Sequence, residues 1–401
     1  MHKTFWFQLH WFVGIVFGLT LFIIGVSGAI LSYEKEILQA INKDTYFVNI
    51  PQDKQILSTK EILEKYQIEN PDSKINGISF SSDKSSSVVL NIASKDPKQR
   101  KGESIYLNPY TAEVLPKIEY REFFSFIRSL HRWLAFEGDA RTIGKNIVAI
   151  STIACIILTI GGVIVYWPRV KNNFLRSFTF SFKHKKRAFL STMHSAIGMW
   201  IVPFFLLLCL TGLYWSYDWY RSAMFTVMGV EQPKRATPTT QVVKSVEQKD
   251  NKVVKEENSE NQPEILSYET AQKVADIFNQ NVSRDYKNAN LRLTPLKDGF
   301  YTISYLYADA THFRESNSME IDPNKSIVVK EAKFEDKKLN EQLMSSMLPL
   351  HSGEYFGWFG QLAYFISSAL MALFVITGYM LYFDRWKKKR AKALKEKQVN
   401  L

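Results

Sequence analysis

The sequence contains only two cysteines among 401 residues, Cys155 and Cys209. Both fall inside apolar stretches, so no disulfide framework is expected in the polar parts of the chain. The sequence also has no C-x-x-C-H motif, no glycine-rich dinucleotide fingerprint after a strand and no P-loop. Covalent haem attachment and the common nucleotide-binding domains are therefore excluded. We expect the two cysteines to act as small packing residues.

Two segments have almost no acidic residues. Between Arg169 and Arg187 there are seven lysines and arginines and no acid, and from Asp384 onward there are eight with two acids. These segments carry +7 and +6 of a net charge of +12, which leaves the rest of the chain close to neutral. Because basic loops stay on the cytoplasmic side of a membrane, this charge indicates topology and not nucleic-acid binding.

Four long apolar stretches stand among polar ones, at 12–31, 143–166, 200–215 and 362–383. A helix needs about twenty such residues to cross a bilayer, and the third stretch reaches that length only with its flanks. The first exceeds the apolar region of a cleaved signal peptide, which has about 7–15 residues. The sequence therefore predicts an α-helical membrane protein with a bundle of four transmembrane (TM) helices.

The basic segments set the expected orientation in a bacterial-type cytoplasmic (inner) membrane. Both termini are expected in the cytoplasm, and the two long polar segments in the periplasm. The expected order is TM helix 1 at 5–33, a first outer module at 34–120, an interfacial helix with TM helix 2 at 121–167, a basic loop at 168–190, TM helix 3 at 191–220, a flexible linker at 231–263, a second outer module at 264–345, TM helix 4 at 350–383 and a basic tail at 384–401.

Internal similarity relates the two halves of the chain. One constant offset in residue number aligns His10, Gly14, Ser27 and Gly28 with His194, Gly198, Thr211 and Gly212. A second constant offset aligns Gly144, Gly162, Tyr166 and Arg169 with Gly360, Gly378, Tyr382 and Arg385. Both halves begin on the same side of the membrane. We therefore predict two parallel repeats, related by a pseudo-twofold axis along the membrane normal.

Each outer segment has the pattern of a small α+β module. The first predicts a helix at 58–67, strands at 74–80, 87–93 and 104–107, and a turn at 108–112. The second predicts a helix at 268–278, strands around 291–295, 300–306 and 319–321, and a turn at 322–326. Alternation of apolar and polar residues supports the strands, and Ser58 is a typical residue to begin a helix.

Four of the seven histidines occupy related places in the two halves. His10 and His194 lie near the cytoplasmic ends of spans one and three, whereas His131 and His351 precede spans two and four on the outer side. The pseudo-twofold axis would place each pair on opposite sides of one point. Six-coordinate haem needs its two axial ligands in that arrangement. The pattern predicts two haem b groups, one ligated by His10 and His194 and one by His131 and His351.

Other interpretations of these histidines stay open at this point. They include a different metal site, a proton-transfer role and an interfacial structural role. Gly14 and Gly18 would let a flat macrocycle approach the backbone, but a G-x-x-x-G pattern also indicates close helix packing. His312, in the second outer module, is a weaker candidate for a substrate contact. Candidate partners for propionates or an anionic chelate, unless they simply face solvent or headgroups, are Arg128, Arg132, Arg141 and Arg221.

Several motifs together resemble the PepSY-associated transmembrane family. They are Leu9-His10-x3-Gly14, Ser27-Gly28-Ala29-Ile30-Leu31, Leu130-His131-Arg132-Trp133-Leu134, Tyr166-Trp167-Pro168-Arg169, His194-x3-Gly198, Leu210-Thr211-Gly212-Leu213 and Leu350-His351-Ser352-Gly353-Glu354. The outer modules resemble PepSY domains, including the turn from Asn108 to Val114. Ala112 departs from that turn, which more often has glycine there.

The resemblance implies haem-mediated electron transfer to periplasmic Fe(III), in a ferric siderophore or another Fe(III) chelate, with release of Fe(II). It implies a bilayer-embedded oxidoreductase that receives electrons from a cytoplasmic or quinol donor and has no nucleic-acid partner. The same resemblance also allows a non-catalytic, membrane-anchored PepSY protein that binds or regulates peptidases. Parallel repeats would permit a transporter, but the spans contain few charged residues or helix breaks. No catalytic residue is predicted; the four histidines are predicted as haem-iron ligands.

Overall fold

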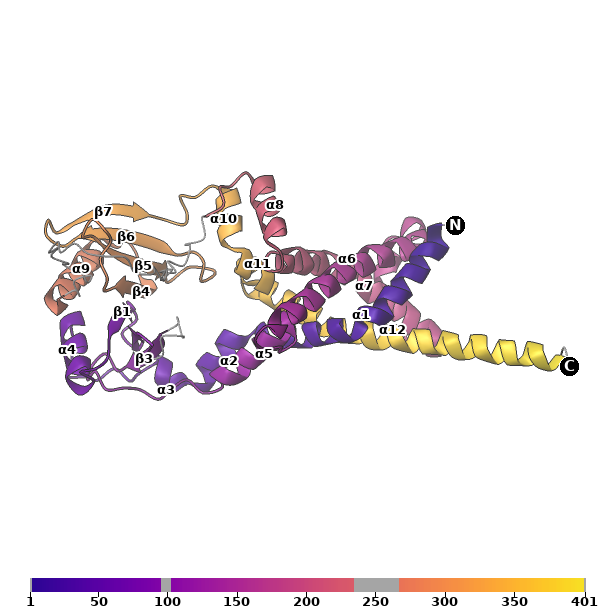
Figure 1. Cartoon of the computed structure of the whole chain (residues 1–401), viewed down its shortest axis with the longest axis horizontal. Coiled ribbons are helices and arrows are strands. Elements are labelled where there is room, and N and C mark those ends of the chain that lie inside the picture. The colour runs from indigo at the N-terminus through magenta and orange to yellow at the C-terminus, as the bar shows by residue number, and fades with distance from the viewer. Residues whose placement is uncertain (1, 95–101, 234–266, 400–401) are drawn as a thin grey trace, which may run out of the picture.

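The structure is a computed structural model that describes residues 2–94, 102–233 and 267–399. Apart from its first three residues, the predicted linker at 231–263 lies outside these ranges. Figure 1 shows a β-sheet with two helices at one end of the molecule, a bundle of long helices, and both chain termini at the opposite end. We call these the sheet end and the termini end of the bundle.

Four helices form the bundle: α1 (His2–Leu31), α6 (Ala140–Asn172), α7 (Lys186–Leu213) and α12 (Gly357–Val399). Each is long and apolar enough to cross a membrane, as the apolar stretches predicted. Helices α1 and α7 each pack against α6 and α12, so the four close into a ring of contacts. The buried cysteines pack with Leu21 inside this ring, and both are free thiols.

Helix α12 extends well past residue 383, where its span was predicted to end, and reaches Val399. The added part is rich in lysine, arginine and alanine, which favour helix, and it contains no glycine or proline. Two ion pairs of i,i+4 spacing run along it, Asp384 with Lys388 at 3.2 Å and Glu396 with Lys392 at 3.7 Å. The helix therefore continues beyond the apolar stretch because local propensity supports it.

Short helices connect the bundle to the sheet. They are α2 (Glu34–Ile41), α3 (Lys43–Tyr46), α5 (Arg121–Trp133), α8 (Asp218–Met228), α10 (Leu339–Ser345), α11 (Met347–Ser352) and the 3-10 turn η2 (Glu354–Phe356), while a second 3-10 turn, η1 (Leu175–Phe178), lies between α6 and α7. Gly353 ends α11 with a positive φ of 86°, and a side-chain carbon there would lie 2.6 Å from the carbonyl oxygen of Gly360. Only glycine fits this turn, which directs the chain from α11 into α12.

The strands of both predicted modules join in one antiparallel sheet of seven strands. Its strands are β1 (Ile75–Phe80), β2 (Val88–Ile92), β3 (Glu103–Leu107), β4 (Tyr286–Arg292), β5 (Tyr301–Tyr307), β6 (Asn317–Asp322) and β7 (Ile327–Ala332). Their order across the sheet is β3-β2-β1-β4-β5-β6-β7. Strands β1 and β4 pair at the centre, with Ile78 opposite Leu291. The sequence predicted two modules but did not predict that their strands pair in one sheet.

Helices α4 (Thr59–Glu69) and α9 (Tyr268–Asn281) pack against the sheet and against each other. Leu63 from α4 and Phe278 from α9 are fully buried with Leu291 and Ile303 from the central strands. Ser58 begins α4 with a capping box, as its place in the sequence predicted. The apolar contacts between strands and helices thus form one core that crosses the boundary between the two modules.

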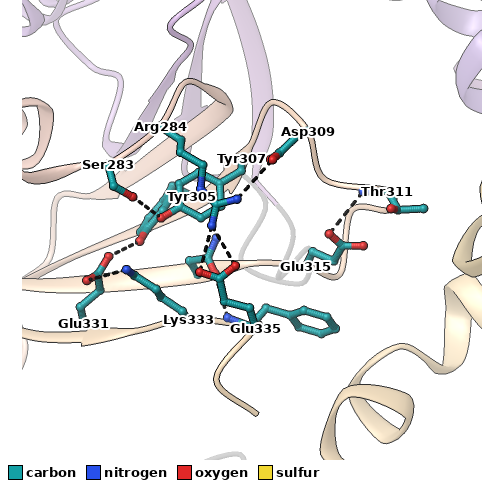
Figure 2. Close-up of polar contacts among 12 residues, drawn as sticks. Ser283, Arg284, Tyr305, Tyr307, Asp309, Thr311, Glu315, Glu331, Lys333 and Glu335 are labelled. Atoms are coloured by element: carbon teal, nitrogen blue, oxygen red, sulfur yellow. Dashed lines mark hydrogen bonds and ion pairs between the residues drawn. The ribbon is translucent and has the colours of Figure 1, made fainter. Parts of the chain in front are cut away.

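The loops of the second module carry a polar network outside this core. Figure 2 shows Arg284 between Asp309 and Glu335, at N–O distances of 3.2 and 2.8 Å. The backbone N–H of Thr311 donates to Glu315 at 3.3 Å, which closes the loop that carries His312. In the first module Ala112 has a φ of 65°, the left-handed conformation expected where PepSY turns more often have glycine.

Candidate functional site

Two histidines meet at the sheet end of the bundle. His131 lies in α5 and His351 in α11, and their ring centres are 6.2 Å apart at an interplanar angle of 56°. Burial lowers the pKa of His131 to about 4 and the pKa of His351 to about 3. Both rings are therefore neutral at pH 7, the state in which imidazole binds a metal ion.

Hydrogen bonds fix the same tautomer in both rings. Nδ1 of His131 lies 3.0 Å from the carbonyl oxygen of Ile24, which can only accept a proton, and 3.1 Å from the hydroxyl of Ser27. Nδ1 of His351 lies 3.0 Å from the hydroxyl of Thr211, which donates its own proton to a carbonyl of α7 at 2.6 Å. In both rings Nδ1 must therefore donate, which leaves the lone pair on Nε2.

A second pair of histidines meets at the termini end. His10 in α1 and His194 in α7 have ring centres 6.4 Å apart at an interplanar angle of 79°. Nδ1 of His194 lies 2.7 Å from the hydroxyl of Thr377, whose proton goes to the carbonyl of Leu373 at 2.7 Å. Nδ1 of His194 therefore donates as well, which leaves the lone pair of this ring on Nε2. Nδ1 of His10 is buried and has no hydrogen-bond partner within the described ranges.

Glycines form the surface on which three of these rings lie. A side-chain carbon on Gly28 would lie 3.1 Å from Cε1 of His131, and one on Gly212 would lie 3.1 Å from Cε1 of His351. A side-chain carbon on Gly162 would lie 3.3 Å from Cε1 of His10. These distances are shorter than ordinary carbon contacts, so the rings pack directly against helix backbone.

The two pairs lie far apart along the bundle. In α1, 18 residues separate His10 from Gly28, which touches His131, and in α7 the same interval separates His194 from Gly212, which touches His351. At 1.5 Å per residue this interval is about 27 Å along the helix axis. That length is close to the roughly 30 Å thickness of the hydrocarbon core of a bilayer. The pairs therefore stand near opposite ends of the apolar part of the bundle.

The histidine motifs occur within a chain that matches one family model, described as the PepSY-associated TM region, over residues 7–385. The protein belongs to this family. No curated protein matches the chain. The family match covers most of the four long helices, both histidine pairs and the sheet, so the features described above lie inside the matched region.

In this PepSY-associated TM protein, a cavity of about 660 Å³ opens between the four long helices at the termini end. His10 and His194 both line it, and three exposed cations also line it, Arg187, Arg385 and Lys389. Its volume lies within the roughly 300–1,000 Å³ typical of small-molecule and cofactor pockets. In the sequence, these cations indicated membrane topology alone. Their position beside the histidines depends on how the helices pack.

The arginines predicted as anion partners at the sheet end have different surroundings. Arg128 forms an ion pair with Glu34 and is therefore already neutralised. The guanidinium groups of Arg132 and Arg141 lie 4.7 and 4.6 Å from the ring centre of the tryptophan that ends α5. Nε of Arg221 is buried without a hydrogen-bond partner among the residues that the structure describes. Its guanidinium also lies over aromatic rings, 5.2 Å from the ring centre of Tyr214 and 5.8 Å from that of Phe225.

His312 lies apart from both histidine pairs. Its ring is buried and stacks on Tyr355 of η2 with ring centres 5.3 Å apart, and its Nε2 is 3.6 Å from the carboxylate of Glu315. Burial lowers the pKa of His312, which Glu315 and Glu354 partly oppose. These contacts attach the second module to the segment that follows His351, so the geometry indicates docking and not a substrate contact.

The hydroxyls of Ser27, Thr211 and Thr377 had no role predicted from the sequence. Ser27 and Thr211 were matched only as equivalent positions of the two halves. A signal was present, because each hydroxyl residue directly precedes a glycine on a membrane helix. The contact of each hydroxyl with a histidine of another helix is a tertiary feature, which no local pattern reveals.

Proposed function

We propose that this protein is a dihaem transmembrane electron carrier that reduces periplasmic Fe(III), held in a ferric siderophore or another Fe(III) chelate, and releases Fe(II). The observation that carries the proposal is the spacing of the histidine pairs, 6.2 Å and 6.4 Å between ring centres. Two metal–nitrogen bonds of about 2 Å each, plus about 1 Å from each nitrogen to its ring centre, span roughly 6 Å.

The residues around the pairs fit a haem at each site. Each pair supplies two imidazoles, which leaves the remaining positions of an iron to a macrocycle. Within the described residues no cluster of three or more His, Cys, Asp or Glu is placed to hold a bare metal ion. The cavity between His10 and His194 has the volume of a cofactor site, and its three exposed cations suit the carboxylates of haem propionates.

The same observations support two parallel repeats with PepSY-like modules. Ser27 and Thr211, which are equivalent positions of the two halves, make equivalent hydrogen bonds to His131 and His351. The two modules contribute matching helices and strands to one sheet around the β1–β4 pair. With the basic segments in the cytoplasm, the termini end faces inward and the sheet lies in the periplasm. The inner membrane of a bacterial-type cell is the membrane we propose.

When bound, haem carries one electron at each site, and each Fe(III) that becomes Fe(II) takes up one electron. The donor that supplies these electrons is proposed to be a quinol or a reduced carrier in the cytoplasm. The protein would hold each haem through two imidazoles. It keeps the Nδ1 protons of three of these histidines on fixed acceptors and excludes water with apolar helices. Reduction weakens the hold of hard oxygen donors on iron, which explains release of the product.

The proposal is tested with protein purified in mild detergent from haem-replete cells. Its visible spectrum should show b-type haem that dithionite reduces. Addition of an Fe(III) chelate to the reduced protein should reoxidise the haem and produce Fe(II), trapped with a coloured chelator in a one-to-one ratio to the haem oxidised. A colourless protein would support the alternative of a membrane-anchored binding or regulatory protein. Haem that stays reduced in the presence of the Fe(III) chelate would show that the protein carries electrons but does not reduce this substrate.

A further inference from the structure

Three of the four histidines share a recurring arrangement. In each, Nδ1 lies within hydrogen-bonding distance of a serine or threonine hydroxyl that directly precedes a glycine on a neighbouring helix: Ser27-Gly28 for His131, Thr211-Gly212 for His351 and Thr377-Gly378 for His194. For His131 the carbonyl of Ile24 is a second acceptor at 3.0 Å. The alignment of the two halves that matches Gly162 with Gly378 places Gly161 where the other half has Thr377. The fourth dipeptide of this kind is therefore Gly161-Gly162, in which a glycine stands in place of the serine or threonine.

His10 is the histidine that packs against the Gly161-Gly162 dipeptide. A side-chain carbon on Gly162 would lie 3.3 Å from Cε1 of His10, much as carbons on Gly28 and Gly212 would meet the rings of His131 and His351. The backbone arrangement is thus retained, and only the hydroxyl is missing. The backbone carbonyl of Leu158 still faces the ring of His10. It does not form a hydrogen bond of normal geometry, because the buried Nδ1 has no such partner within the part of the chain that the structure describes.

A small polar side chain at Gly161 would reach toward His10 but would also press on Trp6. A side-chain carbon on Gly161 would lie 3.9 Å from Nδ1 of His10, so a hydroxyl one bond further could come within hydrogen-bonding distance. The same carbon would lie 3.3 Å from Cε3 of Trp6 and 3.7 Å from its Cζ3. The indole ring therefore fills the place next to His10 that a threonine occupies next to His194.

An acceptor on Nδ1–H makes an imidazole a stronger donor to a bound metal and favours the oxidised state of that metal. A ligand that lacks the acceptor donates less and favours the reduced state. His194 has a short bond of 2.7 Å to Thr377, and His10 has no equivalent bond. The termini-end site therefore has one strongly and one weakly donating ligand, whereas both ligands of the sheet-end site have acceptors.

We propose that Gly161, by denying His10 a hydroxyl acceptor, sets the midpoint potential of the termini-end haem above the value that a serine or threonine at this position would give. Gly161 is a positioning residue that acts through His10. This inference rests on the proposed haem sites. A raised potential makes electron uptake from a mild reductant more favourable at the end where electrons are proposed to enter.

The test is a redox titration of the visible spectrum of the purified holoprotein, with haem content measured for each variant. Gly161→Ser should lower the midpoint potential of one haem relative to Gly161→Ala, which adds the carbon without the hydroxyl. Thr377→Val removes the acceptor of His194 at nearly constant shape and should raise the midpoint potential of that same haem. Neither change should shift the second haem, which His131→Ala identifies by its loss.

Equal midpoint potentials in Gly161→Ser and Gly161→Ala, with both haems bound, would overturn the inference while leaving the haem sites intact. Both Gly161 variants could lose haem because Trp6 is displaced, and in that case Thr377→Val is the deciding variant. An unshifted midpoint potential of the termini-end haem in Thr377→Val would overturn the inference, and a raised one would support it. A wild-type protein without haem would instead contradict the proposed function. The two failures are therefore distinguishable in one set of samples.

Discussion

The hydroxyl of Thr211 lies 3.0 Å from Nδ1 of His351 and joins the third long helix to the histidine that precedes the fourth. Ser27 and His131 make the equivalent contact at 3.1 Å in the other half of the chain. Because both hydroxyls also donate to their own helices, each is held in one orientation. The four side chains thus form one arrangement in which the donor atoms Nε2 are fixed before any cofactor binds.

Loss of the hydroxyl of Thr211 should weaken the sheet-end site. Thr211→Val leaves the buried Nδ1–H of His351 without this acceptor, which costs about 1–3 kcal/mol. A lost hydrogen bond to a metal-binding histidine typically lowers metal affinity by about 10–100-fold. Haem content and thermal stability of the purified variant are the measurements. Thr152→Val is a matched control, because that hydroxyl bonds only to a carbonyl of its own helix at 2.8 Å. An equal loss of haem in both variants would show that the histidine contact is not the cause.

Methyl groups added at Gly28 or Gly212 should displace the rings of the sheet-end pair. Each added carbon would lie 3.1 Å from a histidine Cε1, in contact with a ring that has little freedom to move. Gly28→Ala and Gly212→Ala should therefore lower haem content to about one per chain. Gly198→Ala, whose added carbon meets only Phe374 at 3.8 Å, should leave the sheet-end site unchanged. Retention of two haems in the first two variants would contradict direct packing of the rings on these glycines.

The cations that line the termini-end cavity should help to retain an anionic cofactor. Changing Arg187, Arg385 and Lys389 together to glutamine removes three charges that all line the cavity. Exposed pairs contribute about 0.2–1 kcal/mol each, so the triple change should weaken retention of one haem by roughly 1–3 kcal/mol. Transfer of haem to apomyoglobin measures this loss. Lys388→Gln, on the same helix as Arg385 and Lys389 but not in the lining of the cavity, should have no effect.

Docking of the second module should depend on pH through His312. Burial lowers its pKa from the ordinary value of 6.5, against the opposing effect of Glu315 and Glu354. The undocked loop therefore binds more protons than the docked loop below pH 6.5, so docking is complete above that pH and weakens as the pH falls. Hydrogen exchange at the amides of 308–316 should increase toward pH 5 after correction for intrinsic rates. An unchanged pH dependence in His312→Gln would assign the effect to another group.

The bundle could be predicted from the sequence because its signals are local. Long apolar stretches define spans, and repeated glycine and histidine positions relate the halves without knowledge of packing. The pairing of His10 with His194 followed from the repeat offset, and the structure brings their rings together. For His131 and His351 the offset differs by four residues from that of the spans, yet their rings also meet.

Other features could not be predicted because they depend on tertiary contacts. The pairing of β1 with β4 joins residues more than 200 positions apart, and alternation within each strand does not reveal a partner in another module. The hydroxyl acceptors contact histidines on different helices, and the cavity cations belong to segments that a topology rule already explained. That Nδ1 of His10 has no hydrogen-bond partner among the described residues likewise depends on how the helices pack.

The central claim is that each pair of histidines holds one haem. Haem content and spectra of four single variants test it most directly: His10→Ala, His194→Ala, His131→Ala and His351→Ala. We predict two haems per chain in the wild-type protein and one in each variant. His10→Ala and His194→Ala should share one residual spectrum, and His131→Ala and His351→Ala should share the other. Two haems retained in any variant, or a residual spectrum shared across the two pairs, would contradict the account.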